Sequence, residues 1–317
     1  MAKKVADQLV DTLEKAGVRR IYAVTGDSLN EVNEAVRKNG RLRWIHVRHE
    51  ETGAYAAAAE AQLTGELACC AGSSGPGHVH LINGLYDAQR SGARVLAIAS
   101  TIPSREFGTE YFQETNTIKL FDDCSYYNQV ATTPEQFPRM LQGAMQAAIS
   151  SCGVGVIGLP GDLAAENATA GLSSTFSFPT RQRVCPEQEI RELADLLNNA
   201  KKVTLYCGIG AKDAHPELVQ LAKYEKVREN LRSAAAVRGK EEKIQPEYVI
   251  SVVDELSSDD AIFTVDTGMT CVWGARYLQA TGMRKMLGSF NHGSMANAMP
   301  QAIGAALAYP GRQVVAL

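Results

Sequence analysis

Glu50 is the residue whose type and place in the sequence most directly suggest chemistry. It belongs to the run Arg48-His49-Glu50-Glu51, where a predicted strand meets the start of a predicted helix. Side chains at the carboxyl ends of strands lie where open α/β sheets bind ligands, and a carboxyl group there can hold or transfer a proton. Acidic residues at a helix start also interact favourably with the helix dipole, and the spacing alone favours this simpler interpretation.

Two glycine-rich segments would let the backbone approach a ligand closely. Residues 72–77 connect a predicted strand to a helix, but their glycines are spaced G-x-x-G-x-G and the Lys-Ser/Thr of a P-loop is absent. Gly208 and Gly210 follow another predicted strand. Asp213 stands where a dinucleotide fingerprint has its third glycine, so an ordinary turn is the favoured interpretation there.

Histidine and cysteine residues give weaker signals. His292, in the run Asn291-His292-Gly293-Ser294-Met295, suits a loop histidine bonded to its neighbours as well as a functional group. The seven cysteines include no C-x-x-C pair, so we expect reduced cysteines used as small core residues. Cys69 and Cys70 are adjacent in a strand pattern and should face opposite sides of a sheet.

The overall composition is that of an ordinary soluble globular protein. The chain has 317 residues, of which 45% are hydrophobic, and a net charge of −3. This charge gives no electrostatic support for a nucleic-acid partner. The N-terminal residues lack the apolar core of a signal peptide, and no apolar stretch approaches the about 20 residues that span a bilayer. We therefore expect a cytoplasmic protein.

Alternating strands and helices must position these segments. The patterns predict strands at 20–24, 43–49, 67–71, 94–100, 126–132 and 153–159, and helices at 5–16, 51–63, 78–90 and 135–150. A further helix, capped by Asp27 or Ser28, should end near Gly40. The fold class is therefore α/β, with a doubly wound parallel sheet of about six strands. Glu50 and residues 72–77 should lie at the same carboxyl edge of this sheet.

The second half of the sequence is less regular. Helices at 187–199 and 215–231 flank one strand at 202–207, and a single strand does not make a stable sheet. A charged stretch at 225–243 follows, and the helix–strand alternation resumes over 248–256, 261–265, 272–277 and 294–308. The sequence stops within a strand pattern at 313–317. We expect a chain that is incomplete at its C-terminus, shortened between about 225 and 242, and joined by a linker at 173–179.

Several motifs together resemble one family. They are residues 24–28 (VTGDS), 48–51 (RHEE), the loop 72–77 followed by Leu81-Ile82-Asn83-Gly84-Leu85, residues 111–114 (YFQE) and 288–300 (GSFNHGSMANAMP). In this order they are similar to bacterial pyruvate oxidase, the quinone-linked pyruvate dehydrogenase, which depends on thiamine diphosphate (ThDP). The resemblance covers residues 1–224 and 245–317.

The resemblance implies a domain plan and an activity. Residues 1–174 would bind the cofactor's pyrimidine, 180–243 would be a remnant of a middle FAD-type domain that is mostly missing, and 244–317 would begin the diphosphate-binding domain. Family members oxidatively decarboxylate pyruvate to acetate and CO2 through a ThDP carbanion, and FAD passes the electrons to a quinone. They use Mg²⁺, form homotetramers as dimers of dimers with active sites at subunit interfaces, and contact the inner membrane peripherally at full length.

The resemblance also implies roles for individual residues. Glu50 matches the glutamate that hydrogen-bonds the pyrimidine, Ser74 and Pro76 match its binding loop, and Phe112 and Gln113 match residues near the reacting centre. Met295 matches the residue that props ThDP in its bent shape. The other cofactor-binding matches are Gly26 and Asp27 in the first motif, Asp266 and Gly268 near the diphosphate, Gly293 and Ser294 beside Met295, and Gly208 and Gly210 in the first FAD loop.

Departures from the family leave alternatives open. The metal motif, Gly-Asp-Gly and a later Asn, would lie beyond Leu317, so we expect no magnesium ligands here, and most FAD contacts are also missing. We therefore expect that this chain alone is not competent in the reaction. A non-catalytic truncated homologue or assembly partner is one alternative. An enzyme similar to acetolactate synthase is another, disfavoured because residues 111–114 and 291–295 look more like the oxidase.

Overall fold

The computed structural model describes residues 3–169, 185–205, 207–211, 214–221 and 244–317. The described residues belong to two compact units. The first spans Met1–Phe178, Asp260–Val272 and Lys285–Leu317, and the second spans Pro179–Asp259 and Trp273–Arg284. The expected domain boundaries at 174, 180 and 243, the expected linker at 173–179 and nearly all of the charged stretch at 225–243 lie outside the described residues.

The first unit contains a six-stranded sheet in which every neighbouring pair of strands is parallel. In spatial order the strands are β2 (Arg43–His46), β1 (Arg20–Ala23), β3 (Ala68–Gly72), β4 (Val95–Thr101), β6 (Val154–Pro160) and β5 (Tyr127–Val130). The expectation of a parallel sheet of about six strands is confirmed. All residues of β3, β4 and β6 are buried, as expected for strands covered on both faces.

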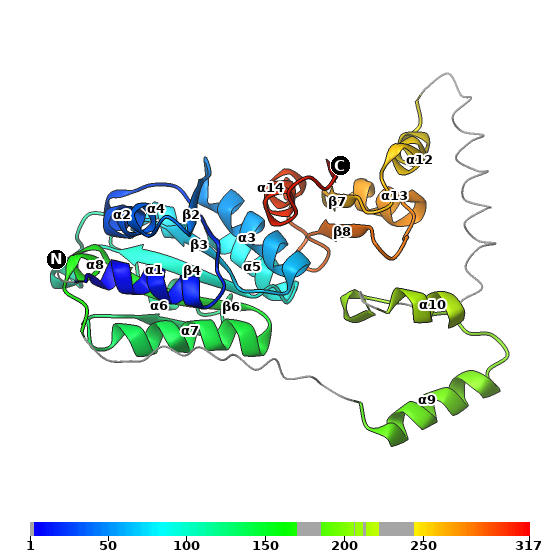
Figure 1. Cartoon of the computed structure of the whole chain (residues 1–317), viewed down its shortest axis with the longest axis horizontal. Helices are drawn as coiled ribbons and strands as arrows, with labels where there is room; N and C mark the ends of the chain where they lie inside the picture. Colours follow the sequence, from blue (N-terminus) through cyan, green and yellow to red (C-terminus); the bar gives the residue numbers. More distant parts are fainter. Residues whose placement is uncertain (1–2, 170–184, 206, 212–213, 222–243) are drawn as a thin grey trace. The chain divides into compact units, whose positions relative to one another are not determined.

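Helices cover both faces of this sheet (Figure 1). One core lies under α1 (Val5–Lys15), α2 (Asn30–Asn39), α7 (Phe137–Ser151) and α8 (Gly161–Ala165), and the other under α3 (Glu50–Thr64) and α5 (Ile82–Arg90). Cys69 belongs to the first core and Cys70 to the second, which confirms that these neighbours point to opposite faces. The α/β doubly wound fold is therefore present.

The strand order locates the crevice of the sheet. From β1 the chain passes to β2 on one side and then to β3 on the other, so the order reverses between β1 and β3. Open α/β sheets bind ligands at such a switch point, outside the carboxyl ends of the strands. The 3-10 helix η1 (Asp27–Leu29) follows β1 there, and the short helix α4 (Pro76–Val79) follows β3.

Helix α3 is buried on nearly all sides. It is rich in alanine, and residues 53–61 along it are all buried. It packs against the sheet, against α5 and against α14 (Ala298–Ala308). A Cβ added at Gly304 of α14 would overlap the carbonyl oxygen of Ala56, so glycine permits this close helix contact.

A second, three-stranded parallel sheet belongs to the same unit. Its order is β8 (Lys285–Gly288), β7 (Ile262–Val265) and β9 (Val314–Ala316), and α14 packs on all three strands. The other short elements of the chain are η2 (Ser104–Glu106), α6 (Thr117–Leu120) and α13 (Met269–Tyr277). Among the residues described, no helix combines the length and the apolar character that a membrane span requires.

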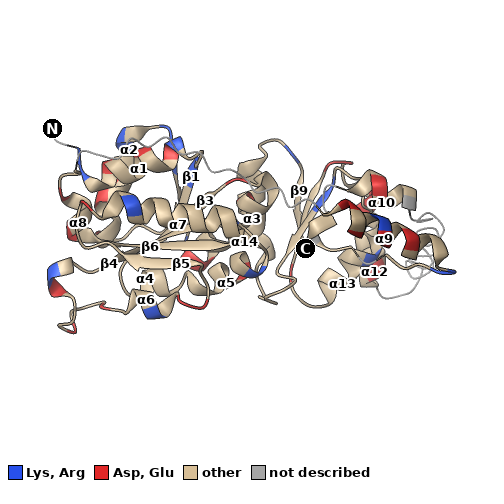
Figure 2. Cartoon of the chain, turned by 90° about the horizontal axis from the view of Figure 1, so that it is seen from below, with Lys and Arg blue, Asp and Glu red and all other residues tan. Residues whose placement is uncertain are grey.

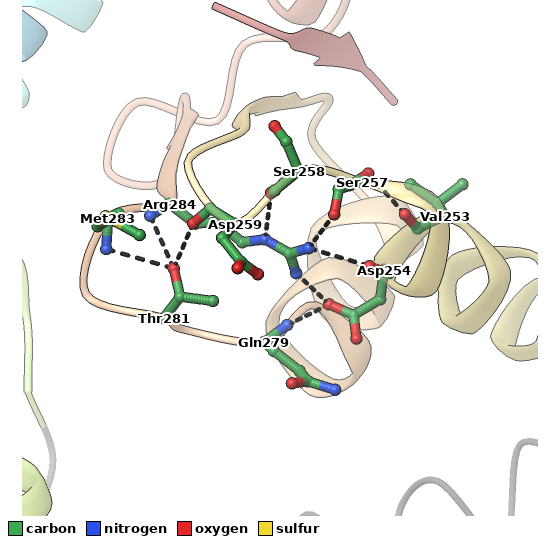
Figure 3. Close-up of polar contacts among 9 residues, drawn as sticks. All are labelled: Val253, Asp254, Ser257, Ser258, Asp259, Gln279, Thr281, Met283 and Arg284. Carbon is green, nitrogen blue, oxygen red and sulfur yellow. Dashed lines mark hydrogen bonds and ion pairs between the residues drawn. The ribbon is translucent and has the colours of Figure 1, made fainter.

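The second unit contains the helices α9 (Glu187–Asn199), α10 (His215–Leu221) and α12 (Pro246–Leu256), and the 3-10 turn η3 (Ile209–Ala211). Figure 3 shows how Arg284 closes the end of α12. Its guanidinium lies 2.6 Å from Asp254 Oδ1 and donates to the carbonyl oxygens of Asp254, Ser257 and Ser258. Because both charged side chains are over 90% buried, each needs the other to compensate its lost hydration.

The structure corrects several local expectations. The helix expected at 78–90 is interrupted after Val79 and restarts at Ile82. Neither Asp27 nor Ser28 caps a helix by its side chain, because both lie within η1. Residues 203–205 of the strand expected at 202–207 form no strand, and β8 was not expected.

Charged residues do not gather on one face of the first unit. Figure 2 shows Lys and Arg interspersed with Asp and Glu along α1 and α2. On α2, Glu34 lies 2.7 Å from Arg37 and 3.5 Å from Lys38. This mixture agrees with the weak net charge of −3 and offers no basic track for a phosphate backbone.

Candidate functional site

Glu50 is the first residue of α3, directly after the segment that leaves β2. His49 caps this helix, since its Nδ1 accepts the Glu51 backbone N–H at 3.3 Å. Glu50 is only 7% exposed. Its Oε2 lies 3.1 Å from His80 Nδ1, and its Oε1 lies 3.3 Å from where a Cβ on Gly77 would stand. The structure thus confirms that Glu50 and the 72–77 loop share the carboxyl edge of the sheet.

The loop 72–77 folds tightly against the turn that follows β1. Ser28 Oγ accepts the Ser74 backbone N–H at 2.9 Å and lies 3.0 Å from Ser73 Oγ. A Cβ on Gly26 would overlap the Ser73 side chain, so these two strand-end turns meet only because residue 26 is glycine. Residues near Gly26 and Ser74 therefore face one another at the switch point.

Gln113 reaches the same loop from a distant segment. Ser74 Oγ donates to Gln113 Oε1 at 2.8 Å, and Ser74 is itself buried. The backbone of Gln113 has φ +67°, a left-handed conformation that is uncommon for a residue with a side chain. Glu114 steadies this turn, because its carboxylate accepts the N–H groups of Gly108 at 2.6 Å and Tyr111 at 3.2 Å.

His78 supports the loop from below. Its Nδ1 lies 2.8 Å from the carbonyl oxygen of Ser100, which can only accept, so Nδ1 carries the proton. Nε2 is then the acceptor for the Thr115 hydroxyl at 2.5 Å. Burial lowers the pKa of His78 below its ordinary value of 6.5. A neutral His78 thus connects α4 to the segment that carries Gln113.

A cavity of about 720 Å³ adjoins that segment. Its lining comes from the end of β4, from the 107–118 segment and from the end of β5, and includes Phe107, Tyr111, Glu114 and Ile118. Neither Glu50 nor Pro76 lines it. Phe112 does not line it either and is 78% exposed.

A second cluster forms between β7 and α14. Asp266 Oδ1 accepts the backbone N–H groups of Asn297 at 2.7 Å and Ala298 at 3.1 Å, at the start of α14. Thr267 Oγ1 donates to the carbonyl oxygen of Ser294 at 2.6 Å. Gly268, with φ +116°, and Gly293, with φ +79°, both have open space where a Cβ would stand. This cluster brings the predicted residues Asp266, Gly268, Gly293 and Ser294 close together.

Buried polar contacts join this cluster to α3 and α5. Ser294 Oγ accepts from Tyr55 Oη and lies 3.1 Å from Asn83 Oδ1. Asp87 of α5 accepts from Ser289 Oγ at 2.6 Å and from Gln301 Nε2 at 3.3 Å. Burial raises the pKa of Asp87, and the hydrogen bond from Ser289 opposes the rise.

The structure therefore groups some predicted site residues and leaves others apart. Ser74, Gln113 and Glu50 gather around the 72–77 loop, with Pro76 at the start of α4. Asp27 is exposed in η1, and Met295 is 77% exposed beside the second cluster. Gly208 and Gly210 belong to the second unit, and a Cβ on either would meet no atom within 4 Å.

The residues present fit some of the groups that the resemblance implies. Glu50 is a buried carboxyl beside glycine backbone, which suits a flat aminopyrimidine. An oxygen cage for Mg²⁺ is not found in the described ranges, where the one group of three suitable side chains is His49, Glu50 and His80. Asp266 Oδ1 is already engaged by backbone N–H groups. The open space around Gly208 and Gly210 does not test the FAD expectation.

Sequence reasoning did not single out several residues of the site. Ser28, His78, His80, Asn83 and Asp87 all make polar contacts described above. A usable signal existed, because each follows the carboxyl end of a strand in the crevice region or lies within the next two helical turns.

Comparisons with known proteins agree with this geometry. Residues 3–120 match the thiamine pyrophosphate enzyme N-terminal TPP-binding domain, and residues 266–317 match the C-terminal TPP-binding domain of such enzymes. An uncharacterized 42.6 kDa protein of Pseudomonas amyloderamosa is 51% identical over 221 residues, which is 69% of this chain and 56% of that protein. Pyruvate oxidase of Lactiplantibacillus plantarum is 36% identical over 223 residues, 69% of this chain and 37% of the oxidase.

A chloroplastic acetolactate synthase of Arabidopsis thaliana is 30% identical over 221 residues, 68% of this chain and 33% of the synthase. The chain thus matches about half of the first relative's length and little more than a third of the other two. Both the oxidase and the synthase align with a similar share of this chain. Through its N-terminal and C-terminal TPP-binding domain matches, the chain belongs to the family of thiamine pyrophosphate enzymes.

Proposed function

We propose that Glu50 hydrogen-bonds the aminopyrimidine of ThDP at the switch point of the six-stranded sheet, and that the protein serves the oxidative decarboxylation of pyruvate. The observation that supports this proposal is the buried carboxylate of Glu50 beside Gly77. A carboxyl group shielded from water can keep a proton at Oε1 or Oε2 and donate it to a ring nitrogen. ThDP, when bound, supplies the electron sink that such reactions require.

The surrounding residues position this carboxyl group. His80 Nδ1 holds Glu50 Oε2, which leaves Oε1 directed toward Gly77 and the loop backbone. The Ser74–Gln113 hydrogen bond closes the loop and restricts water on that side. We assign Ser74 and Pro76 to the pyrimidine, Asp266, Gly268, Gly293 and Ser294 to the neighbourhood of the diphosphate, and exposed Met295 to a contact with the cofactor.

Pyruvate is the substrate we propose. Support comes from the relative named pyruvate oxidase, whose 36% identity exceeds the 30% of the acetolactate synthase. The oxidase reading also includes FAD, with Gly208 and Gly210 as its first contacts, and a quinone as electron acceptor. Phe112 and Gln113 would then approach the substrate, and the turn at Gln113 already contacts the pyrimidine loop.

A homo-oligomer with sites at the subunit interface completes the proposal. Support comes from large apolar side chains around α14 that are exposed in the single chain, namely Phe290 (53%), Met295 (77%), Met299 (66%) and Ile303 (36%). Light scattering after gel filtration measures the mass of the particle. A monomer at micromolar concentration would contradict this part of the proposal.

The pyrimidine assignment can be tested without the diphosphate or a metal. The probe is 4-amino-5-hydroxymethyl-2-methylpyrimidine, titrated into the protein and followed by NMR line broadening of its methyl signal. We expect saturable binding that Glu50→Gln weakens and that Glu51→Gln leaves unchanged, since Glu51 is held outward by Asn83 Nδ2 at 2.7 Å. Equal binding by all three proteins would overturn the role of Glu50.

The reaction requires a separate test. Protein supplied with ThDP, Mg²⁺, FAD and pyruvate is assayed for CO2 release, for reduction of a soluble quinone and for products. Acetate formed together with reduced quinone supports the oxidase proposal. Acetolactate without quinone reduction would assign the synthase reaction instead, and bound ThDP with no product would indicate a non-catalytic relative.

A further inference from the structure

His49, Glu50 and His80 form a compact group of potential metal ligands. One ligand atom from each lies within 4.8 Å of the other two, and within the described part of the chain no other group of three His, Cys, Asp or Glu side chains does so. We propose that these three residues bind a divalent transition-metal ion of the zinc, cobalt or copper class. The site uses no diphosphate and therefore does not depend on the proposed cofactor.

The ligand types determine which ions fit. Two imidazoles and one carboxylate suit zinc and its neighbours, whereas magnesium prefers oxygen ligands and water. Zinc sites with three protein ligands leave one position for water or another molecule. His49 and His80 are each a little under half exposed in their side chains, so an ion can enter from solvent, while Glu50 is the buried anchor.

The present distances are close to those of a metal site. Bonds of about 2.0–2.2 Å to a tetrahedral ion hold ligand atoms roughly 3.4 Å apart. His80 Nδ1 and Glu50 Oε2 are 3.1 Å apart, and the rings of His49 and His80 stack with their centroids at 4.3 Å. Only the ring of His49 needs to turn for all three to reach one ion. Little opposes this turn, because the hydrogen bond that His49 Nδ1 accepts from the Glu51 N–H is long at 3.3 Å.

The charge of the surroundings also favours a cation. Glu51 Oε2 lies 3.9 Å from His49 Nδ1, so two carboxylates face two imidazoles. If His49 binds the ion through Nε2, its Nδ1 must carry a proton, and Glu51 is the nearby acceptor. Carboxylates commonly orient metal-binding histidines in this way. The stacked rings have a simpler interpretation as a hydrogen-bonded surface pair, and metal titration separates the two.

Cobalt is the probe, because bound Co²⁺ absorbs visible light in a manner that depends on its ligands. Apo protein, free of ThDP, is titrated with CoCl2 and then with ZnCl2. We expect one ion per chain with a low-coordinate spectrum, displaced by Zn²⁺ and unaffected by excess Mg²⁺. A thiolate-to-cobalt band in the near ultraviolet would place the ion on a cysteine and overturn the proposal.

The variants are His49→Ala, His80→Ala and Glu50→Gln. Each should weaken Co²⁺ binding by more than the roughly 10–100-fold that loss of an outer partner costs. His46→Ala is the matched control, since His46 is an exposed histidine three positions before His49. Circular dichroism confirms folding of each variant, and His80→Asn serves if alanine unfolds the chain. Unchanged affinity in His49→Ala and His80→Ala, or an equal loss in His46→Ala, would exclude the site.

Discussion

Ser289, at the end of β8, donates a 2.6 Å hydrogen bond to Asp87 on α5, although the two residues are 202 positions apart in the sequence. Both are buried, with Asp87 at 0% and Ser289 at 3% exposure. Gln301 of α14 donates to the other carboxylate oxygen. The contact therefore joins the N-terminal and C-terminal TPP-binding sequences within one compact unit.

Asp87 should make the stability of the protein depend on pH. Burial raises its pKa above the ordinary value of 3.8, so the protonated carboxyl is favoured in the folded state. That contribution is complete below pH 3.8 and is lost as the pH rises through the folded pKa. Asp87→Asn keeps the shape without the charge. We expect the stability of the wild type relative to Asp87→Asn to fall as the pH rises above about 4.

Urea unfolding at a series of pH values measures this difference. His292 influences the pKa of Asp87 when it is protonated, so the same series in a His292→Ala background is the control. A difference between wild type and Asp87→Asn that does not change with pH would show that Asp87 titrates normally. A direction opposite to that expected would mean that the hydrogen bond from Ser289 outweighs burial.

His78 should act in the opposite direction. Burial lowers its pKa below 6.5, so the neutral ring contributes stability above pH 6.5 that is lost as the pH falls through the folded pKa. His78→Gln removes the titration. We expect the His78→Gln variant to be less stable than the wild type at about pH 7.5 by about 1 kcal/mol for the altered hydrogen bonds, and this gap should narrow toward about pH 5. Urea unfolding at the two pH values measures the gap, and the exposed control His46→Gln should show no such trend.

Gly304 should tolerate no side chain. Alanine in a helix is ordinarily favoured over glycine by about 1 kcal/mol. Here the added Cβ would overlap the Ala56 carbonyl oxygen, so α14 must move away from α3. We expect Gly304→Ala to destabilise the fold by roughly 1–3 kcal/mol in urea unfolding, despite the better propensity. Gly208→Ala, with open space at its Cβ, is the control, and a stabilised Gly304→Ala would mean that the two helices do not pack this closely.

The sequence predicted the parts of the fold whose patterns are local and complete. β3, β4 and β6 are continuous apolar strands buried on both faces, and all three were expected close to their actual bounds. β8 has few apolar residues and lacked a signal of its own; its pairing with β7 determines it. Residues 203–205 have an apolar strand pattern but form no strand, because a strand requires a neighbour to bond its backbone groups.

The candidate site shows the same division. Glu50 and the 72–77 loop could be placed together because parallel strands end at one edge. The contact between Ser74 and Gln113 could not, since it depends on the path of a long connection and on a left-handed residue. His80 reaches Glu50 because the helix expected at 78–90 breaks after Val79. No periodicity in the sequence marks that break.

Glu50→Gln tests the proposed role of the carboxyl group most directly. Glutamine keeps the size and can still accept a hydrogen bond, but it cannot give a proton to a ring nitrogen and take it back. We expect deuterium exchange of the thiazolium proton in ThDP-loaded protein to slow by roughly 10²–10⁴-fold, the usual cost of losing general acid–base catalysis. Cofactor affinity should change much less, because the diphosphate and the buried rings supply most contacts.

Glu51→Gln is the internal control for this experiment. Glu51 is the next residue of α3, is held by Asn83 and contacts His49 rather than the 72–77 loop. Exchange is stopped with acid and read by NMR of the released cofactor, with Mg²⁺ present and transition metals removed by chelation, so that an ion at His49 and His80 cannot obscure Glu50. If Glu50→Gln protein exchanges at the unmutated rate, Glu50 only starts the helix, as its spacing alone suggested. If Glu51→Gln slows exchange equally, the effect belongs to the charge of the helix N-terminus and not to a positioned proton donor.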